Sequence, residues 1–283
     1  MLADIGRGRF LREGRVSFAS FPFYAGLIAL FWFLATFMIV PMANTLHAAF
    51  FSSGAFEFAG ISSTLFQSGR VRTALLNTVW ITVASTFTVG LVGIFQVLVL
   101  EYFEVKGRTL LKVGFAIPLV FGSVVAATGY KFTYGPNGVV THIFQALYPA
   151  LPDSWFMGGG GVLFAQTFLL TSFYFLFLRA AMRRVDYSTI EAARSLGASE
   201  PVILRRVVFP VLLPTILAVM LLTVFVSTTS FAAPEFLGGR DFIMISQMIL
   251  ILNSIGRPDM AAYRALCLGA FIMCMILLMQ WIE

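Results

Sequence analysis

Long uncharged apolar runs alternate with short polar connections along most of this sequence. Six runs reach or approach the roughly 20 residues that an α-helix needs to cross a bilayer. They are Phe21–Asn44, Leu75–Leu100, Val113–Tyr130, Val162–Leu178, Val211–Ala232 and Ala265–Ile282. A membrane β-barrel strand would instead alternate apolar and polar residues over about ten positions. The pattern therefore predicts an all-α membrane protein with six transmembrane helices.

The composition agrees with this prediction and narrows the chemistry. Of the 283 residues, 59% are hydrophobic and 11% are charged. Cys267 and Cys274 lie about two helical turns apart in the last run, too far for a disulfide, so we interpret them as small apolar fillers. No metal-ligand or catalytic constellation emerges. We expect no catalytic residue, no metal, no cofactor bound by this chain, and no nucleic-acid partner.

The distribution of basic residues predicts the orientation in the membrane. Thirteen of the 19 lysines and arginines precede the first run or follow the second and fourth runs, and six lie on the opposite side. The positive-inside rule therefore predicts that both termini are cytoplasmic. The first run is too long for the core of a signal peptide, so we expect a retained helix after a cytoplasmic segment at residues 1–20.

A polar segment between the fourth and fifth runs, Asp186–Pro201, predicts two short helices joined by a glycine turn on the cytoplasmic side. Ser188 and Glu191 have the spacing of a capping box. Gly197 suits the left-handed residue that ends a helix, and Ser199 can cap a second helix. A short helix with defined ends between membrane segments is typical of a docking element.

Hydroxyl residues are the candidates for a polar pathway through the spans. Their hydroxyls can bond back to the preceding helical turn or line a pathway, and the sequence supports both interpretations equally. The candidates are Ser123, Thr128, Thr167, Thr171, Ser227, Thr228, Thr229, Ser230 and, at the outer mouth, Glu235. No charged residue lies well inside the predicted spans, which disfavours ion coupling. No Gly-x-x-x-x-Gly-Lys-Ser/Thr motif is present, so ATP hydrolysis is not expected on this chain.

The polar segment resembles a known motif. Glu191-Ala192-Ala193, three residues, Gly197, nine residues and then Val207-x-Phe209-Pro210 match the spacing of the EAA motif in the membrane subunits of ABC importers. That motif is Glu-Ala-Ala-x3-Gly-x9-Ile-x-Leu-Pro, and the two departures exchange one apolar residue for another. Asn77-Thr78 is similar to the start of the permease domain in this family, so the resemblance covers roughly residues 70–283.

The resemblance implies a machine with several parts in a bacterial inner membrane. It implies a five-helix permease core at 70–283, preceded by an added helix and outer loop at 21–69. The partners implied are a second permease subunit (an identical copy or a paralogue), two ATPase subunits that carry ATP and Mg, and an external solute-binding protein. The coupling residues implied at the ATPase contact are Ser188, Glu191, Ala192, Ala193, Arg194, Leu196, Gly197 and Pro210.

The substrate is less defined by the sequence. The segment Ser230–Gly239 resembles the corresponding part of permeases for polyamines and ferric iron, a branch that includes thiamine and aminophosphonate importers. Glu235 would attract a cation, whereas Lys131 and Arg240 would attract an anion. An importer of sugars or polyols is the alternative within the family. A stand-alone secondary transporter or channel, or a membrane scaffold, are the alternatives outside it.

Overall fold

The computed structural model describes residues 21–51, 69–103 and 105–282, and these residues form helices joined by turns and loops. The chain divides into two units, Met1–Glu57 and Phe58–Glu283. In the first unit, α1 (Phe21–Leu34), the π-helical segment η1 (Ala35–Ile39) and α2 (Val40–Phe50) follow one another without a break. The apolar stretch Phe23–His47 is long enough to span a membrane, and none of its side chains is buried. Its exposed aromatic side chains suit a lipid surrounding.

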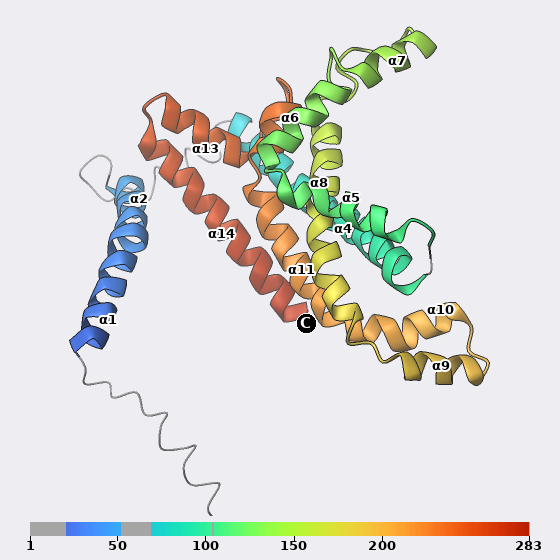
Figure 1. Ribbon diagram of the computed structural model, residues 1–283. Helices are drawn as coiled ribbons and strands as arrows, with labels where there is room; N and C mark the ends of the chain where they lie inside the picture. The colour runs from blue at the N-terminus through green and yellow to red at the C-terminus, as the bar shows by residue number, and fades with distance from the viewer. Residues whose placement is uncertain (1–20, 52–68, 104, 283) are drawn as a thin grey trace, which may run out of the picture. The chain divides into compact units, whose positions relative to one another are not determined.

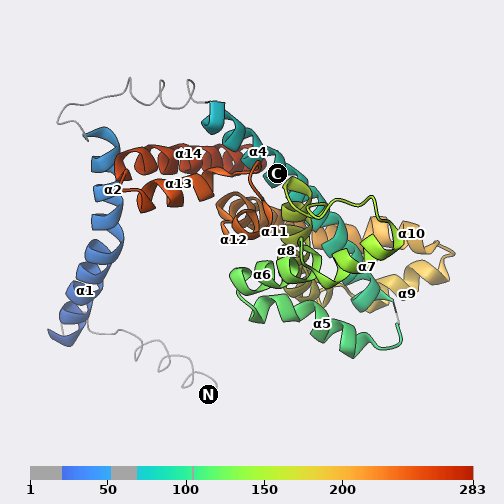
Figure 2. The ribbon, with the colours of Figure 1, turned by 90° about the horizontal axis from the view of Figure 1, so that it is seen from above.

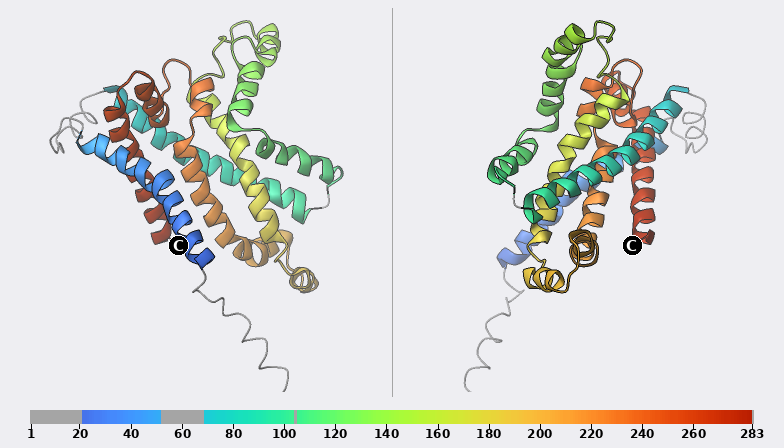
Figure 3. Two further views of the ribbon diagram at one scale, coloured as in Figure 1. Left: turned by 60° about the vertical axis from the view of Figure 1, so that its left-hand side comes forward. Right: turned by 90° about the vertical axis from the view of Figure 1, so that its right-hand side faces the viewer.

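The second unit contains the remaining helices, which are shown in Figures 1 and 2. They are α4 (Gly69–Val97), η2 (Leu98–Tyr102), α5 (Arg108–Val120), α6 (Ser123–Tyr134), α7 (Val139–Leu147), α8 (Gly159–Met182), α9 (Tyr187–Ser195), α10 (Glu200–Ile203), η3 (Leu204–Val208), α11 (Phe209–Thr229), α12 (Ala232–Leu237), α13 (Ile245–Ser254) and α14 (Pro258–Ile282). Within this unit α4, α8 and α11 pack against one another, and α13 lies along α14. The short helices α9 and α10 lie at the opposite end from α7 (Figure 3).

Five helices of the described residues are long and apolar enough to cross a membrane, or six if one bent pair counts as a span. That pair is α5 and the stretch Ser123–Leu147, which contains α6 and α7, and the two members meet at an angle of 111°. The prediction of one continuous span at Val113–Tyr130 is therefore wrong. Phe121 and Gly122 leave the helical conformation at the break, with ψ of 123° and 153°. Pro118 lies inside the turn that precedes the break and weakens the helix there, because it has no backbone N–H.

The fifth span also begins earlier than its apolar run. The sequence places its start at Val211, beyond Pro210, but α10, η3 and α11 form a continuous helical backbone from Glu200 to Thr229. The helix changes direction near η3 (Figure 1). Pro210 cannot donate to the ladder, and the wider π-helical turn just before it accommodates that loss. The second helix of the Asp186–Pro201 segment is thus the first part of the fifth span.

The last span contains a charge that its apolar run did not include. The predicted run begins at Ala265, whereas α14 begins at Pro258, and the membrane-length stretch is Met260–Leu278. Arg264 therefore lies within this span, and only 8% of its surface is exposed. Its Nε atom has no hydrogen-bond partner among the described residues. The expectation that no charge lies well inside the spans still holds, because Arg264 stands four residues after the start of the membrane-length stretch, but α14 starts about two turns before the uncharged run.

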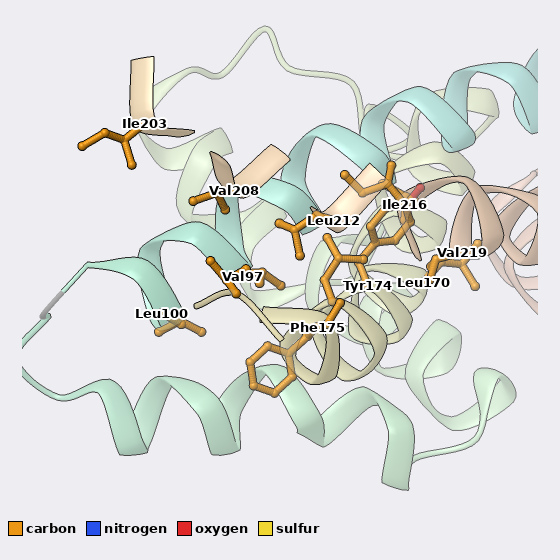
Figure 4. Packing of buried hydrophobic residues seen from close by; sticks show 14 of the residues in the cluster. Val97, Leu100, Leu170, Tyr174, Phe175, Ile203, Val208, Leu212, Ile216 and Val219 are labelled. Atoms are coloured by element: carbon orange, nitrogen blue, oxygen red, sulfur yellow. The ribbon is translucent and has the colours of Figure 1, made fainter. Parts of the chain in front are cut away.

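The main hydrophobic cluster joins the membrane helices to the Asp186–Pro201 segment. Its buried members come from α4, η2, α8, η3 and α11, together with Val185, Ile190 of α9 and Ile203 of α10. Figure 4 shows ten of them with labels, among them Ile203 and Tyr174. Tyr174 is fully buried at the centre of this cluster, and it packs directly on Gly93 of α4. Small residues allow such close approach between membrane helices, so Gly93 sets the contact between α4 and α8.

We predict that Gly93→Ala destabilises the protein. A Cβ at this position would lie 2.4 Å from Cβ of Tyr174 and 2.6 Å from its Cγ, which forces the two helices apart. Overpacking of this kind typically costs about 1–3 kcal/mol. Thermal unfolding of the purified protein in detergent measures the effect. Gly114→Ala is the matched control, because its Cβ would meet nothing within 4 Å. Equal melting temperatures for the two variants would contradict this account of the α4–α8 contact.

Candidate functional site

The N-cap of α9 lies two residues earlier in the chain than the sequence predicts. Asp186 is its N-cap, with an extended backbone, and the carboxylate Oδ1 accepts a hydrogen bond from the Ser188 N–H at 2.9 Å. Ser188 is therefore inside the first turn, and the predicted capping box of Ser188 with Glu191 is wrong. Aspartate caps a helix as well as serine does. Asp186 and Ser188 are both good N-cap residues, and the spacing of Ser188 and Glu191 favoured the wrong one.

The end of α9 has the predicted conformation. Gly197 has φ of +79°, in the left-handed region, which confirms the expected glycine turn. The Ala198 N–H donates to the carbonyl of Ala193 at 3.0 Å, and the Gly197 N–H donates to that of Arg194 at 2.9 Å. These two bonds form a Schellman motif. A Cβ on Gly197 would meet nothing within 4 Å, so the backbone angle is the reason for glycine here.

The segment α9–α10 has an anchored face and an uncovered face. Ile190 and Ile203 are buried in the main hydrophobic cluster, at 2% and 1% exposure. On the other face Leu196 is 88% exposed, and Tyr187 is 64% exposed. The exposed face also carries Glu191, Ala192 and Arg194, while Ala193 is half-buried and Pro210 is exposed. We call Tyr187, Glu191, Ala192 and Leu196 the exposed α9 face.

An ion cluster lies near this segment, and the sequence analysis did not identify it. Glu101, at the end of η2, accepts a hydrogen bond from Arg108 at 3.0 Å and forms ion pairs with Lys112 at 2.6 Å and Arg179 at 3.0 Å. Its side chain is only 13% exposed. The cluster joins the ends of α4, α5 and α8, and three cations on one half-buried carboxylate balance the cost of burying it. In the sequence, this cluster could have been predicted from the single acid Glu101 at the end of an apolar run, because basic residues follow it.

A second polar contact ties the glycine turn to α4. The Nε of Arg194 donates to Oε1 of Glu200 at 2.8 Å, across the turn at Gly197. The other carboxylate oxygen of Glu200 accepts from the hydroxyl of Tyr102, which is the last residue of η2. The position of α9 and α10 is therefore fixed to the end of the second span by side chains as well as by apolar packing.

The hydroxyl residues of the spans divide into two groups. The first group joins helices in the interior. Thr167 pairs with Thr88 at 2.8 Å, and Thr228 pairs with Thr82 at 3.1 Å. The buried Thr171 bonds back to the carbonyl of Thr167. These side chains satisfy one another or their own helix and lie in helix contacts.

Gln166 of α8 is the centre of this polar layer. Its Oε1 accepts from Ser85 of α4 at 2.7 Å and from Ser227 of α11 at 2.8 Å. The side chain is 2% exposed, and its Nε2 has no hydrogen-bond partner among the described residues. The sequence analysis did not single out Gln166, although a lone amide in an otherwise apolar run is a signal that could have found it.

The second group lines a cavity of about 280 Å³. Ser123 of α6, Thr229 and Ser230 line it together with Gln166, and apolar side chains complete its wall. The cavity lies where two helices are interrupted, between α5 and α6 and between α11 and α12. The two remaining candidates are elsewhere. Thr128 bonds back to the carbonyl of Val124 at 2.7 Å, and Glu235 is exposed on α12, where it accepts from Gln247 at 2.9 Å.

The two regions have different chemical capabilities. The cavity offers hydroxyl and amide groups for binding, and no cluster of three His, Cys, Asp or Glu in the described ranges could hold a metal ion. The α9–α10 segment offers an uncovered face of mixed apolar and charged character on a firmly anchored helix. Its features are those of a contact surface for another protein.

Comparison with known proteins agrees with these features. Residues 58–283 match the family described as "Binding-protein-dependent transport system inner membrane component". The ABC transporter permease protein y4fN of Sinorhizobium fredii is 61% identical over 261 residues, which are 92% of this chain and 46% of that protein. This chain thus spans about half the length of that relative. The permease PhnU of Salmonella typhi, named for 2-aminoethylphosphonate transport, is 27% identical over 76% of this chain and 75% of its own.

Solved structures show the same fold. A chain of a bacterial ABC transporter involved in the import of the acidic polysaccharide alginate superimposes with a TM-score of 0.74. The match covers 92% of this chain and 93% of that chain at 18% identity, and it shows the fold alone. The family match confirms the resemblance that the EAA spacing indicated. This chain belongs to the family of binding-protein-dependent transport system inner membrane components, the permeases of ABC transporters.

Proposed function

We propose that this chain forms part of the translocation pathway of an ATP-driven importer in a bacterial inner membrane. A second set of permease helices, from an identical copy or a paralogue, completes the pathway. Two separate ATPase subunits bind ATP and Mg, and an external binding protein delivers a small polar solute. The observation that carries this proposal is the α9–α10 segment, which presents an uncovered face and is continuous with a membrane helix.

The segment can transmit movement because of how it is attached. Ile190 and Ile203 fix it to the core of α4, α8 and α11, and Glu200 begins the same helix that ends at Thr229. An ATPase that moves the exposed α9 face therefore displaces the fifth span directly. The bond from Tyr102 to Glu200 carries the same displacement to the second span.

The orientation follows from the charges near this segment. Arg108, Lys112 and Arg179 gather on Glu101 beside the α9–α10 end, and this end is cytoplasmic by the positive-inside rule. The same rule predicts cytoplasmic N- and C-termini. The exposed α9 face then faces the compartment that holds ATP.

The solute classes that we favour are polyamine, ferric iron, thiamine and aminophosphonate. The resemblance at Ser230–Gly239 supports all four classes, and the likeness to a permease named for 2-aminoethylphosphonate supports the last. A sugar or polyol remains the alternative substrate class within the same mechanism.

Reconstitution tests this function against its alternatives. The chain is placed in proteoliposomes with its partner permease helices, the ATPases and the binding protein, and uptake of each solute class is measured with and without ATP. We expect uptake only with the complete set and ATP. Uptake by the chain alone would identify a stand-alone transporter or channel. A scaffold would leave uptake and substrate choice unchanged when the hydroxyls of Ser227–Ser230 are replaced by alanine.

We predict that Gly197→Asp lowers ATP-dependent uptake at least about tenfold. Aspartate at φ of +79° is strained, and the substitution adds a charge beside the exposed α9 face. Gly107→Asp is the matched control, because Gly107 has φ of +81°, its Cβ would also meet nothing within 4 Å, and it lies outside this face. Solute uptake and ATP hydrolysis are measured together. Wild-type uptake by Gly197→Asp, or an equal loss in the control, would refute the role of this turn in coupling.

We predict that Tyr102→Phe reduces the amount of solute transported per ATP hydrolysed. The substitution removes the hydroxyl that donates to Glu200 and keeps the ring. Because this bond is exposed to solvent and therefore weak, we expect a reduction of roughly twofold. Tyr148→Phe, at an exposed tyrosine that follows α7, is the control. A transport ratio equal to that of the control would show that the link between η2 and α10 is not used in transmission.

A further inference from the structure

We propose that the cavity beside Gln166 binds a hydrogen-bond acceptor group of the transported solute, of the phosphonate or carboxylate class. This inference rests on the proposed function, because it assigns the cavity to the permease pathway. It also selects among the solute classes above, since it favours oxyanionic solutes over polyamines and metal cations.

The first observation is the state of the Gln166 amide. Two serine hydroxyls, from Ser85 and Ser227, donate to its Oε1 and hold the amide plane between α4 and α11. The Nε2 has no partner in the part of the chain that the structure describes, although the side chain is only 2% exposed and lines the cavity. A buried donor without a partner is destabilising, and an acceptor in the cavity would offset that cost.

The second observation is the start of α6. Gly122 is its N-cap and has no side-chain capping bond, and Ser123 and Val124 line the cavity. The helix ladder begins with the Ala126 N–H, which donates to the carbonyl of Gly122 at 3.1 Å. The N–H groups of Ser123, Val124 and Val125 have no acceptor among the described residues, and the helix dipole adds positive potential at this end. Interrupted membrane helices bind anionic substrate groups in this way.

The third observation is that no carboxylate is found among the described residues that line the cavity. The lining of the cavity carries no charged side chain. The Thr229 hydroxyl donates to the carbonyl of Phe225 at 2.9 Å, and the carbonyl of Ser230 accepts from Ser246 at 2.7 Å. A cation entering the cavity would meet no carboxylate, whereas an oxyanion would meet the amide of Gln166 and the start of α6. The chemistry of the lining therefore favours an acceptor.

The depth of the cavity argues for a solute rather than a lipid headgroup. Ser85, which bonds Gln166, stands midway along the 34-residue helix Gly69–Tyr102. Lipid phosphates lie at the ends of such a helix, at the membrane surfaces. The position midway along a membrane helix is instead that of a translocation pathway.

Equilibrium binding tests the proposal. The membrane complex is purified in nanodiscs without the binding protein and without ATP, and radiolabelled 2-aminoethylphosphonate and spermidine are the probes. We expect saturable phosphonate binding and no saturable spermidine binding to the wild type.

Gln166→Glu keeps the oxygen that accepts from the serines and replaces the Nε2 donor by an acceptor. We expect it to weaken phosphonate binding at least about tenfold. Gln280→Glu, at an exposed side chain of α14, makes the same exchange outside the cavity.

A second pair of variants keeps the test decisive if Gln166→Glu does not assemble. Ser123 is exposed, so Ser123→Asp and Ser123→Asn are not expected to disturb folding. The aspartate should weaken phosphonate binding at least about tenfold by repulsion, and the asparagine should change it by less than about twofold. Equal phosphonate affinity in wild type and Ser123→Asp, a preference of the wild type for spermidine, or no saturable phosphonate binding would overturn the proposal. Because binding needs no ATP, this result is independent of whether uptake is ATP-driven.

Discussion

Hydrocarbon contains no water that could satisfy polar groups, so the amides, hydroxyls and carboxylates of the spans need partners within the protein. The interior of the second unit follows this constraint closely. Thr82 and Thr228 pair between α4 and α11, and Ser85 and Ser227 meet on Gln166. Where η2 meets α5 and α8, Glu101 pairs with three basic side chains. Polar contacts of this kind fix the register of helices whose apolar surfaces are otherwise interchangeable.

One exception lies at the candidate cavity. The Nε2 of Gln166 has no partner among the described residues, and it lies where the chain breaks between α5 and α6 and between α11 and α12. An interrupted helix exposes backbone groups that the bilayer would not tolerate unless they line a cavity. The cost of leaving these groups open is consistent with a site that is completed only when a solute enters.

One face of the α9–α10 segment is packed into the protein core, and the other face is exposed. Ile190 and Ile203 are buried among residues of three membrane helices, while Leu196 is almost fully exposed. The helix that begins at Glu200 continues through the π-helical turn into the fifth span. In the proposed machine, force applied outside the membrane therefore reaches the helix that lines the Gln166 cavity, since Thr229 ends that helix and lines the cavity.

The sequence by itself determined the helical class, because continuous apolar runs leave an α-helix as the form that satisfies its own backbone in lipid. It also determined the Gly197 turn and the family, since the left-handed angle and the EAA spacing are local properties of consecutive residues. Only the tertiary structure decided the rest. The cap at Asp186 rather than Ser188, the break at Gly122 and the helical start at Glu200 depend on which local option packs best. The pairing of Gln166 with Ser85 and Ser227 joins residues far apart in the chain, and only the packing of α4, α8 and α11 brings them together.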